Sequence, residues 1–180
     1  MGQVTVTPDE FVLTLFINEE IRLLTQRIAD TIGIPADQPI QVDVNESTPL
    51  RRVSLVSVAP ITVTVESGAL EDPRRPRWLS PLGAEASLAK VLFRARDRID
   101  GSFGDAPAED KVGQGAMSAW NAYSVGRSER VGFYVQKQRQ LYDFRNRHQF
   151  SDAADAVFDR LWGADSLTWS ELSKLSASVS

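Results

Sequence analysis

Two groups of arginines beside aromatic residues are the part of this sequence best suited to chemistry. The first group is Arg74, Arg75, Arg77 and Trp78, and the second is Tyr142, Arg145, Arg147 and His148. A guanidinium group donates paired hydrogen bonds to a carboxylate or phosphate and also stacks on aromatic rings. We therefore predict that these residues bind an anionic ligand. The competing interpretation is that the arginines pair with acidic residues of the same chain and only stabilise the fold.

Basic side chains are concentrated in the middle of the chain, where both groups of arginines lie. The chain has 180 residues and a net charge of −4. Residues 51–150 carry 16 basic and 11 acidic side chains, whereas residues 1–50 carry two and eight, and residues 151–180 carry two and five. A basic middle is thus flanked by acidic ends. The predicted partner is an anionic small molecule or a protein, and the pI of about 5.1 disfavours nucleic acid.

The residue types that are rare or missing exclude several kinds of catalysis. The chain has no cysteine and a single histidine, His148. Thiolate metal sites, iron–sulfur clusters and cysteine nucleophiles are therefore excluded, as is a zinc helix with two histidines. No phosphate-binding glycine motif and no nucleophile elbow is present, and we expect no cofactor and no metal.

Whether the chain is an enzyme stays open at this stage. Four pairs of nearby acids could act as acid and base if burial separated their pKa values: Glu19 with Glu20, Asp43 with Glu46, Glu71 with Asp72, and Glu109 with Asp110. The leading prediction is a binding or interaction module that presents an arginine-rich surface to an anionic ligand or acidic partner. The alternative is a small metal-independent enzyme, a hydrolase or transferase acting on a phosphorylated or carboxylated substrate.

No segment resembles a membrane span or an export signal. The longest mostly apolar run, residues 11–17, is far shorter than the roughly 20 residues that cross a bilayer. The first residues lack the basic start and the apolar run of a signal peptide. We therefore expect a cytoplasmic protein without a membrane partner.

The first third of the chain is predicted to form a strand, a long helix and three further strands. Residues 3–7 alternate like a strand, and Thr7, Pro8 and Glu10 have the pattern of a helix start with a capping box. An apolar stripe then predicts one helix over residues 8–32, ended by Gly33. The alternative pairs residues 11–17 with residues 3–7 as a strand and starts a shorter helix at Asn18.

Short alternating segments at residues 40–44, 53–58 and 61–65 predict the remaining strands of a small sheet. Their short connections favour antiparallel pairing. The predicted fold is α+β, in which a long N-terminal helix packs on an antiparallel sheet of three to four strands and a mainly helical half follows. The first half of that helix is apolar on several sides, which indicates a central core position or a homodimer contact.

The second half is predicted to be a cluster of helices. The proline-rich basic segment 68–80 is expected to be irregular, and a helix follows from Pro81 to Gly101. Further helices are predicted over residues 116–125, over residues that follow a cap at Ser128, and over 152–162. The last helix begins at a capping box formed by Thr168 and Glu171. With no repeat and no linker in the sequence, residues 1–180 are predicted to form a single domain.

Overall fold

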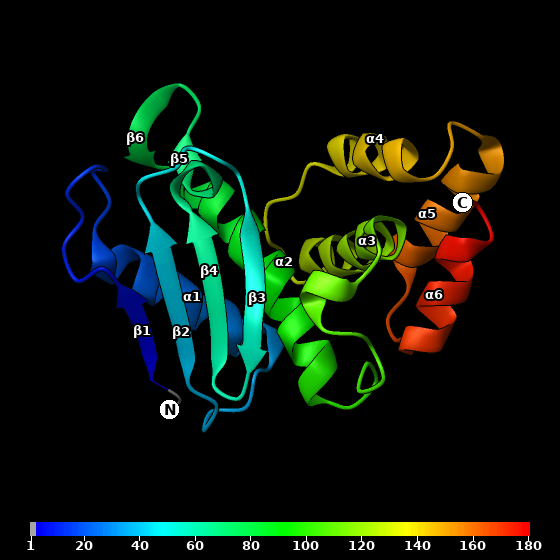
Figure 1. Cartoon of the computed structure of the whole chain (residues 1–180), viewed down its shortest axis with the longest axis horizontal. Coiled ribbons are helices and arrows are strands. Elements are labelled where there is room, and N and C mark those ends of the chain that lie inside the picture. The colour runs from blue at the N-terminus through cyan, green and yellow to red at the C-terminus, as the bar shows by residue number, and fades with distance from the viewer. Residues whose placement is uncertain (1–2) are drawn as a thin grey trace. The chain divides into compact units, whose positions relative to one another are not determined.

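The computed structural model describes residues 3–180, and these fall into two compact units, Met1–Arg96 and Asp97–Ser180 (Figure 1). The first unit contains a four-stranded sheet with helices, and the second contains helices only. Each unit is described by itself below. The expectation of a single domain over residues 1–180 stays a prediction.

The sheet of the first unit is mixed, with strand order β1-β2-β4-β3. Its strands are β1 (Val4–Thr7), β2 (Ile40–Asn45), β3 (Val53–Val58) and β4 (Ile61–Glu66). Strand β2 pairs in parallel with both β1 and β4, and only β3 and β4 are antiparallel. The predicted α+β composition and the four strands are confirmed, whereas the prediction of an all-antiparallel sheet was wrong. The residues between β1 and β2 and those between β2 and β4 carry the chain back to the opposite end, so these strands run the same way.

Alternation along the strands fixes which face of the sheet is buried. Ile40, Val42 and Val44 of β2 are buried, and the polar residues between them stay partly exposed. Helix α1 (Asn18–Ile32) and helix α2 (Pro81–Ile99) lie on one face of the sheet (Figure 1). The buried face therefore packs on helices, and the polar face remains open within this unit.

The first helix is shorter than predicted because residues 8–17 form a loop. Helix α1 begins at Asn18, as the alternative with a shorter helix expected, but residues 11–17 are neither helix nor strand, so both expectations for this segment were wrong. The end of α1 at Gly33, with φ 75° in the left-handed region, agrees with the sequence. Local capping signals at Thr7 and Pro8 are overridden by a contact from distant Glu46, which is described below.

The basic segment expected to be irregular instead forms a hairpin. Strand β5 (Glu71–Asp72) pairs with β6 (Arg75–Leu79), after a short 3-10 helix, η1 (Ser67–Ala69). Pro73 lies in the connection, where no ladder hydrogen bond is needed, and the pairing has a register shift at Glu71 and Asp72. The prolines are thus accommodated by a very short and irregular ladder.

The second unit is a group of helices around an aromatic core. After the short 3-10 helix η2 (Glu109–Lys111) come α3 (Gln114–Arg130), α4 (Lys137–Arg147), α5 (Asp152–Gly163) and α6 (Trp169–Ala177). Trp120 and Phe158 are completely buried in the core, which also includes Trp162. Gly126 allows α3 to approach α5, since a Cβ at this position would lie 2.1 Å from the Trp162 carbonyl oxygen.

The helix limits in this unit agree only partly with the sequence. The Ser151 cap and the capping box of Thr168 and Glu171 are both present. The predicted break at Ser128 was wrong, because α3 continues to Arg130 and the buried Ser128 hydroxyl donates to the Ser124 carbonyl inside the helix. Since burial of α3 on several sides stabilises the continuous helix, a cap residue in its interior does not end it.

Candidate binding surface at the carboxyl edge of the sheet

Three segments leave the same edge of the sheet in the first unit. Residues 8–17 follow β1, residues 46–52 follow β2 and residues 67–80 follow β4 (Figure 1). Because β1, β2 and β4 are parallel, these segments all start at the carboxyl ends of their strands. In open sheets with parallel strands this edge is the usual location of binding sites. We call the surface formed by these three segments the edge surface.

A single carboxylate holds the first segment in place. Glu46 accepts hydrogen bonds from the backbone N–H groups of Val12, Leu13 and Thr14, at 2.8 Å for Leu13 and 2.7 Å for Thr14. It also accepts the Thr14 hydroxyl at 3.0 Å. Burial acts to raise the pKa of Glu46, but these hydrogen bonds outweigh it and hold the pKa below its ordinary value. The loop backbone is therefore fixed by an ionised side chain 32 or more residues away.

Further contacts connect the three segments to one another. The Leu15 N–H donates to the Arg77 carbonyl at 2.8 Å, which links residues 8–17 to β6. A Cβ at Gly68 would lie 1.8 Å from the Pro49 carbonyl oxygen, so only glycine allows this approach to residues 46–52. The Ser67 hydroxyl also lies 3.0 Å from the Thr48 carbonyl oxygen. Together these contacts make the edge surface one connected structure.

The arginines of the edge surface are exposed and carry no ion pair within residues 3–180. They are Arg51, Arg52, Arg74, Arg75 and Arg77. The neighbouring carboxylates bind backbone groups instead, since Asp72 accepts the Arg74 N–H at 2.8 Å and Glu71 accepts the Arg77 N–H at 3.1 Å. The guanidinium groups are thus left available for an external anion.

The first predicted group of site residues lies entirely in this surface. Arg74 is in the turn of the hairpin, and Arg75, Arg77 and Trp78 are in β6. The Arg75 guanidinium lies 4.3 Å from the centre of the Trp78 ring. Arg77 has φ 71°, in the left-handed region that is uncommon for any residue but glycine. The structure therefore brings these four residues together on one short hairpin.

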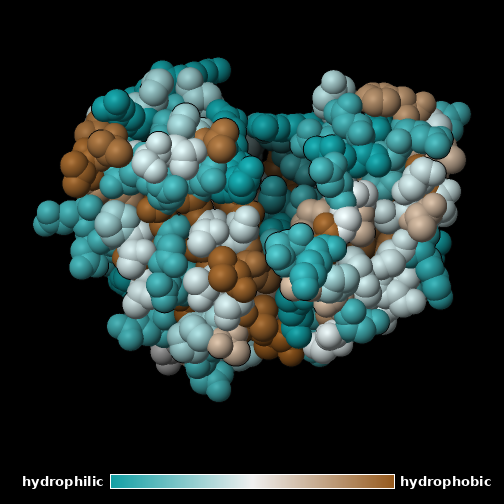
Figure 2. All heavy atoms as spheres, in the orientation of Figure 1, coloured by the Kyte–Doolittle hydropathy of each residue, from teal (hydrophilic) through white to brown (hydrophobic). Residues whose placement is uncertain are grey.

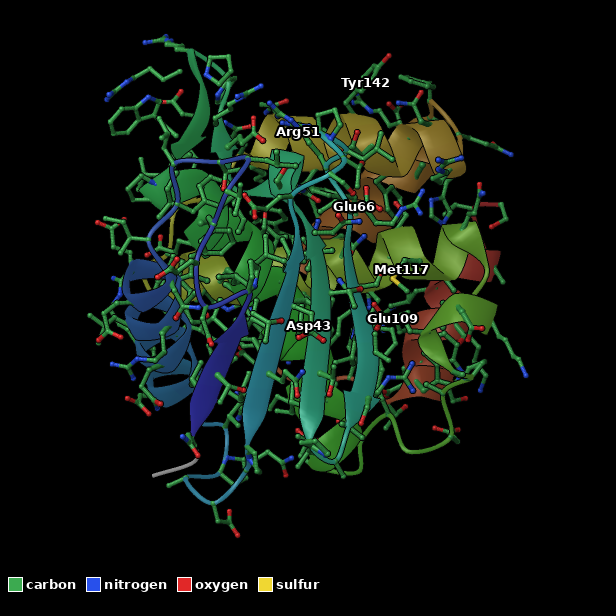
Figure 3. All side chains as sticks on the ribbon, turned by 60° about the vertical axis from the view of Figure 1, so that its left-hand side comes forward. Asp43, Arg51, Glu66, Glu109, Met117 and Tyr142 are labelled. Carbon is green, nitrogen blue, oxygen red and sulfur yellow. The ribbon has the colours of Figure 1, made fainter. Side chains whose placement is uncertain are left out.

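A hollow of about 240 Å³ lies at the carboxyl ends of β2 and β4. Its polar lining consists of Asp43, Asn45, Arg52, Thr64 and Glu66. Asp43 accepts the Thr7 hydroxyl at 2.6 Å and the side-chain amide of Gln41 at 2.9 Å. Figure 3 shows Asp43 on β2, Glu66 near the end of β4 and Arg51 above the strand ends. Two acidic residues, Asp43 and Glu66, thus line the same hollow as Arg52.

The second predicted group lies on α4, and most of its polar atoms contact other residues of the second unit. Arg145 forms a two-pronged ion pair with Asp155, with N–O distances of 2.8 and 2.5 Å. Arg147 donates to the Gln114 side chain at 2.7 Å. Tyr142 is exposed and contacts the Phe150 ring edge-on. Internal contacts therefore occupy both arginines of this group.

His148 belongs to the same group and is half-buried. Its Nδ1 lies 3.0 Å from the Phe144 carbonyl oxygen, and its Nε2 lies 3.0 Å from the Ser176 hydroxyl. The ring also stacks on Phe144. Burial lowers the pKa of His148, against the opposing effect of the hydrogen bond with the Phe144 carbonyl. The neutral ring therefore fits this position between α4 and α6.

Sequence reasoning missed Arg51 and Arg52 as parts of the site, and it considered Glu46 only as an acid–base partner of Asp43. The adjacent arginines follow a stretch rich in turn-forming residues, which was a usable signal for an exposed basic loop. The excess of apolar residues in 11–17 is visible in the sequence, but its pattern predicts a helix instead of an exposed loop. The role of Glu46 had no local signal, because its partners are more than 30 residues away.

No protein family, no curated protein and no solved structure shows a significant match to this chain. Within residues 3–180, no cluster of three or more acidic or histidine side chains is arranged to hold a metal ion. Among the helices of this described part, none has both the length and the apolar character that a membrane crossing requires.

Proposed function

We propose that this protein is a binding module whose edge surface binds an acidic segment of another protein. The observation that carries this proposal is the set of exposed arginines without ion pairs on Arg51–Arg52 and on the β5–β6 hairpin. Guanidinium groups bind carboxylates with directed, paired hydrogen bonds. A cluster of them on one surface also attracts acidic partners and raises the rate of encounter.

The fixed backbone of the edge surface supports binding for an energetic reason. A loop that is already ordered loses little conformational entropy when a partner docks. Here the Glu46 carboxylate, the Leu15 to Arg77 hydrogen bond and the close approach at Gly68 hold the segments before any partner arrives. The arginines are therefore displayed from a preorganised surface, and the partner does not have to order it.

The enzyme alternative has one specific observation in its favour, the hollow that contains Arg52. A hydrolase or transferase for a phosphorylated or carboxylated substrate would place the anion beside Arg52, with Asp43 and Glu66 as candidate acid and base. However, about 240 Å³ is below the roughly 300–1,000 Å³ that is usual for small-molecule sites. Most of the free arginines also lie outside the hollow, so the binding function accounts for more of the surface.

The proposal is tested by measuring the binding of a fluorescein-labelled poly-glutamate peptide to the full chain at low salt. The Arg75→Ala and Arg77→Ala double variant should bind at least about tenfold more weakly, since each lost paired contact is worth on the order of 1 kcal/mol or more. The matched control removes the same charge from exposed positions of the second unit, Arg139→Ala with Arg160→Ala. Equal weakening in both variants, or no binding by the wild type, contradicts the proposal.

A further inference from the structure

The edge surface exposes apolar side chains beside its arginines. Val12 is 83% exposed, and Leu13, Leu15 and Ile17 are each more than half exposed. Figure 2 shows hydrophobic atoms gathered over the loop between β1 and α1. Contiguous exposed apolar surface is uncommon in monomeric proteins and marks sites of interaction.

The exposure in this loop follows a regular alternation. Thr14 and Phe16 are each 6% exposed and point into the unit, whereas Leu13, Leu15 and Ile17 point outward. The chain bends at residues 12–14 and has no regular structure at 15–17, and the three outward residues together form one exposed apolar set, called here the apolar row. The buried pair and the Glu46 carboxylate fix the backbone, which prevents the row from turning inward. The apolar row is therefore a built feature of the loop.

The apolar row lies directly beside the basic hairpin. The Leu15 N–H donates to the carbonyl of Arg77, so the centre of the row is hydrogen-bonded to β6. The same strand carries Arg75 stacked on Trp78, which is itself 46% exposed. A partner covering this region meets apolar side chains and guanidinium groups within one pair of adjacent segments.

We infer that the partner is an acidic amphipathic segment of another protein, with apolar side chains that cover Leu13, Leu15 and Ile17 and carboxylates that reach Arg75 and Arg77. This inference rests on the proposed function and adds that apolar contacts contribute to binding of the partner. Complementary charge gives specificity and a faster encounter, and the apolar contact slows dissociation.

Acidic residues at the two ends of the apolar row favour a peptide partner over a membrane surface. Asp9 and Glu10 precede the row and Glu20 follows it, all exposed, whereas the adjacent Glu19 pairs with Arg22. A flat anionic membrane would bring its phosphates against these carboxylates, whereas a narrow peptide contacts the row and the hairpin only.

The test uses two 18-residue fluorescein-labelled peptides of equal charge. One has leucines on one helical face and glutamates elsewhere, and in the other every leucine is replaced by serine. Wild-type protein should bind the glutamate–leucine peptide at least about tenfold more tightly than the glutamate–serine peptide. The Leu13→Ser and Leu15→Ser double variant should bind both peptides equally and keep its affinity for the glutamate–serine peptide.

A matched control and a direct check of the loop keep this test decisive. Leu23→Ser with Val56→Ser removes two equally exposed apolar side chains elsewhere in the first unit and should preserve the tenfold preference. Amide hydrogen exchange of residues 8–17 checks that the loop stays ordered in the variant. If leucines give no gain in wild-type affinity, the inference fails while the proposed function stands. If neither peptide binds, both fail.

Binding to vesicles that contain phosphatidylserine tests whether the partner is a membrane. Under this inference they should bind the wild type no more tightly than neutral vesicles do. Tight binding to anionic vesicles that depends on Leu13 and Leu15 would overturn the inference and assign the apolar row to a lipid surface.

Discussion

The edge surface of the first unit and the helices of the second unit contain arginines in opposite situations. In the second unit, Arg127, Arg130 and Arg145 are engaged by carboxylates or by carbonyl groups at helix ends. In the first unit, the arginines of the edge surface are exposed and have no such partner within residues 3–180. The same residue type therefore pairs internally among these helices and remains unpaired on the edge surface.

The difference arises from what the nearby carboxylates do. Asp97 faces Arg127 with two N–O distances of 2.7 Å and also accepts the Trp120 indole N–H at 2.7 Å. In the hairpin, Glu71 and Asp72 accept backbone N–H groups, and their arginine neighbours remain free. The arginines of the hairpin thus remain unpaired because the local acids accept backbone donors instead.

The strongest test of this comparison is to remove the buried guanidinium. The side chains of Arg127 and Asp97 are 10% and 2% exposed, so Arg127→Met leaves a buried carboxylate without its cation. We expect the free energy of unfolding to fall by about 3–5 kcal/mol, the usual cost of breaking a buried pair. Urea unfolding followed by tryptophan fluorescence measures this, because Trp120, Trp162 and Trp169 all lie in the second unit.

Arg139→Met is the control for that experiment. Arg139 is an exposed residue of α4, and its replacement should change the free energy of unfolding by less than about 0.5 kcal/mol. A loss below about 1 kcal/mol for Arg127→Met would mean that the buried pair contributes no more than a surface pair. The contrast between the units would then lose its energetic basis.

Much of the secondary structure could be predicted from local signals. The strands at residues 40–44, 53–58 and 61–65 show clear alternation, and Thr168 with Glu171 forms the expected capping box. Parallel pairing of β1, β2 and β4 had no signature in the sequence. It depends on how residues 8–39 return the chain, and the loop at their start is fixed by distant Glu46.

The candidate site was predictable only in part for the same reason. The cluster of Arg74, Arg75 and Arg77 was visible in the sequence, as was the group around Arg145. Nothing local shows that Asp155 pairs with Arg145 while Glu71 binds a backbone N–H. Which arginines remain available depends on tertiary contacts, and neither residue type nor spacing encodes these.

A smaller effect is expected for the carboxylate that orders the edge surface. Glu46→Gln removes the charge and leaves one acceptor oxygen for the three N–H groups and the Thr14 hydroxyl. The free energy of unfolding should fall by about 1–2 kcal/mol, because hydrogen bonds to an ionised group are stronger than neutral ones. Hydrogen exchange of residues 8–17 should accelerate, while exchange in the second unit stays unchanged. Unaltered exchange in this loop would show that Glu46 does not hold it.

A pH effect of smaller size is expected in the second unit. Burial lowers the pKa of His148 in the folded state, so folding favours the neutral ring. The resulting stability is complete above the ordinary histidine pKa of about 6.5 and is lost as the pH falls towards the lowered folded pKa. Melting temperature measured from pH 7.5 to pH 5 should fall less steeply in His148→Gln than in the wild type. Identical profiles in the two proteins would exclude His148 as the source of this dependence.

The smallest effect on stability, and the sharpest contrast between the units, is expected for a pair of matched arginine replacements. Arg75→Met should leave the urea midpoint unchanged, since the guanidinium contacts only the exposed Trp78 ring, whereas Arg145→Met loses the ion pair with Asp155 and should lower the midpoint slightly. Binding of the poly-glutamate peptide should show the opposite order, weakened by Arg75→Met and unaffected by Arg145→Met. If both variants weakened binding equally, the arginines of α4 would also contribute to anion recognition despite their internal partners, and the division of roles between the two units would be wrong.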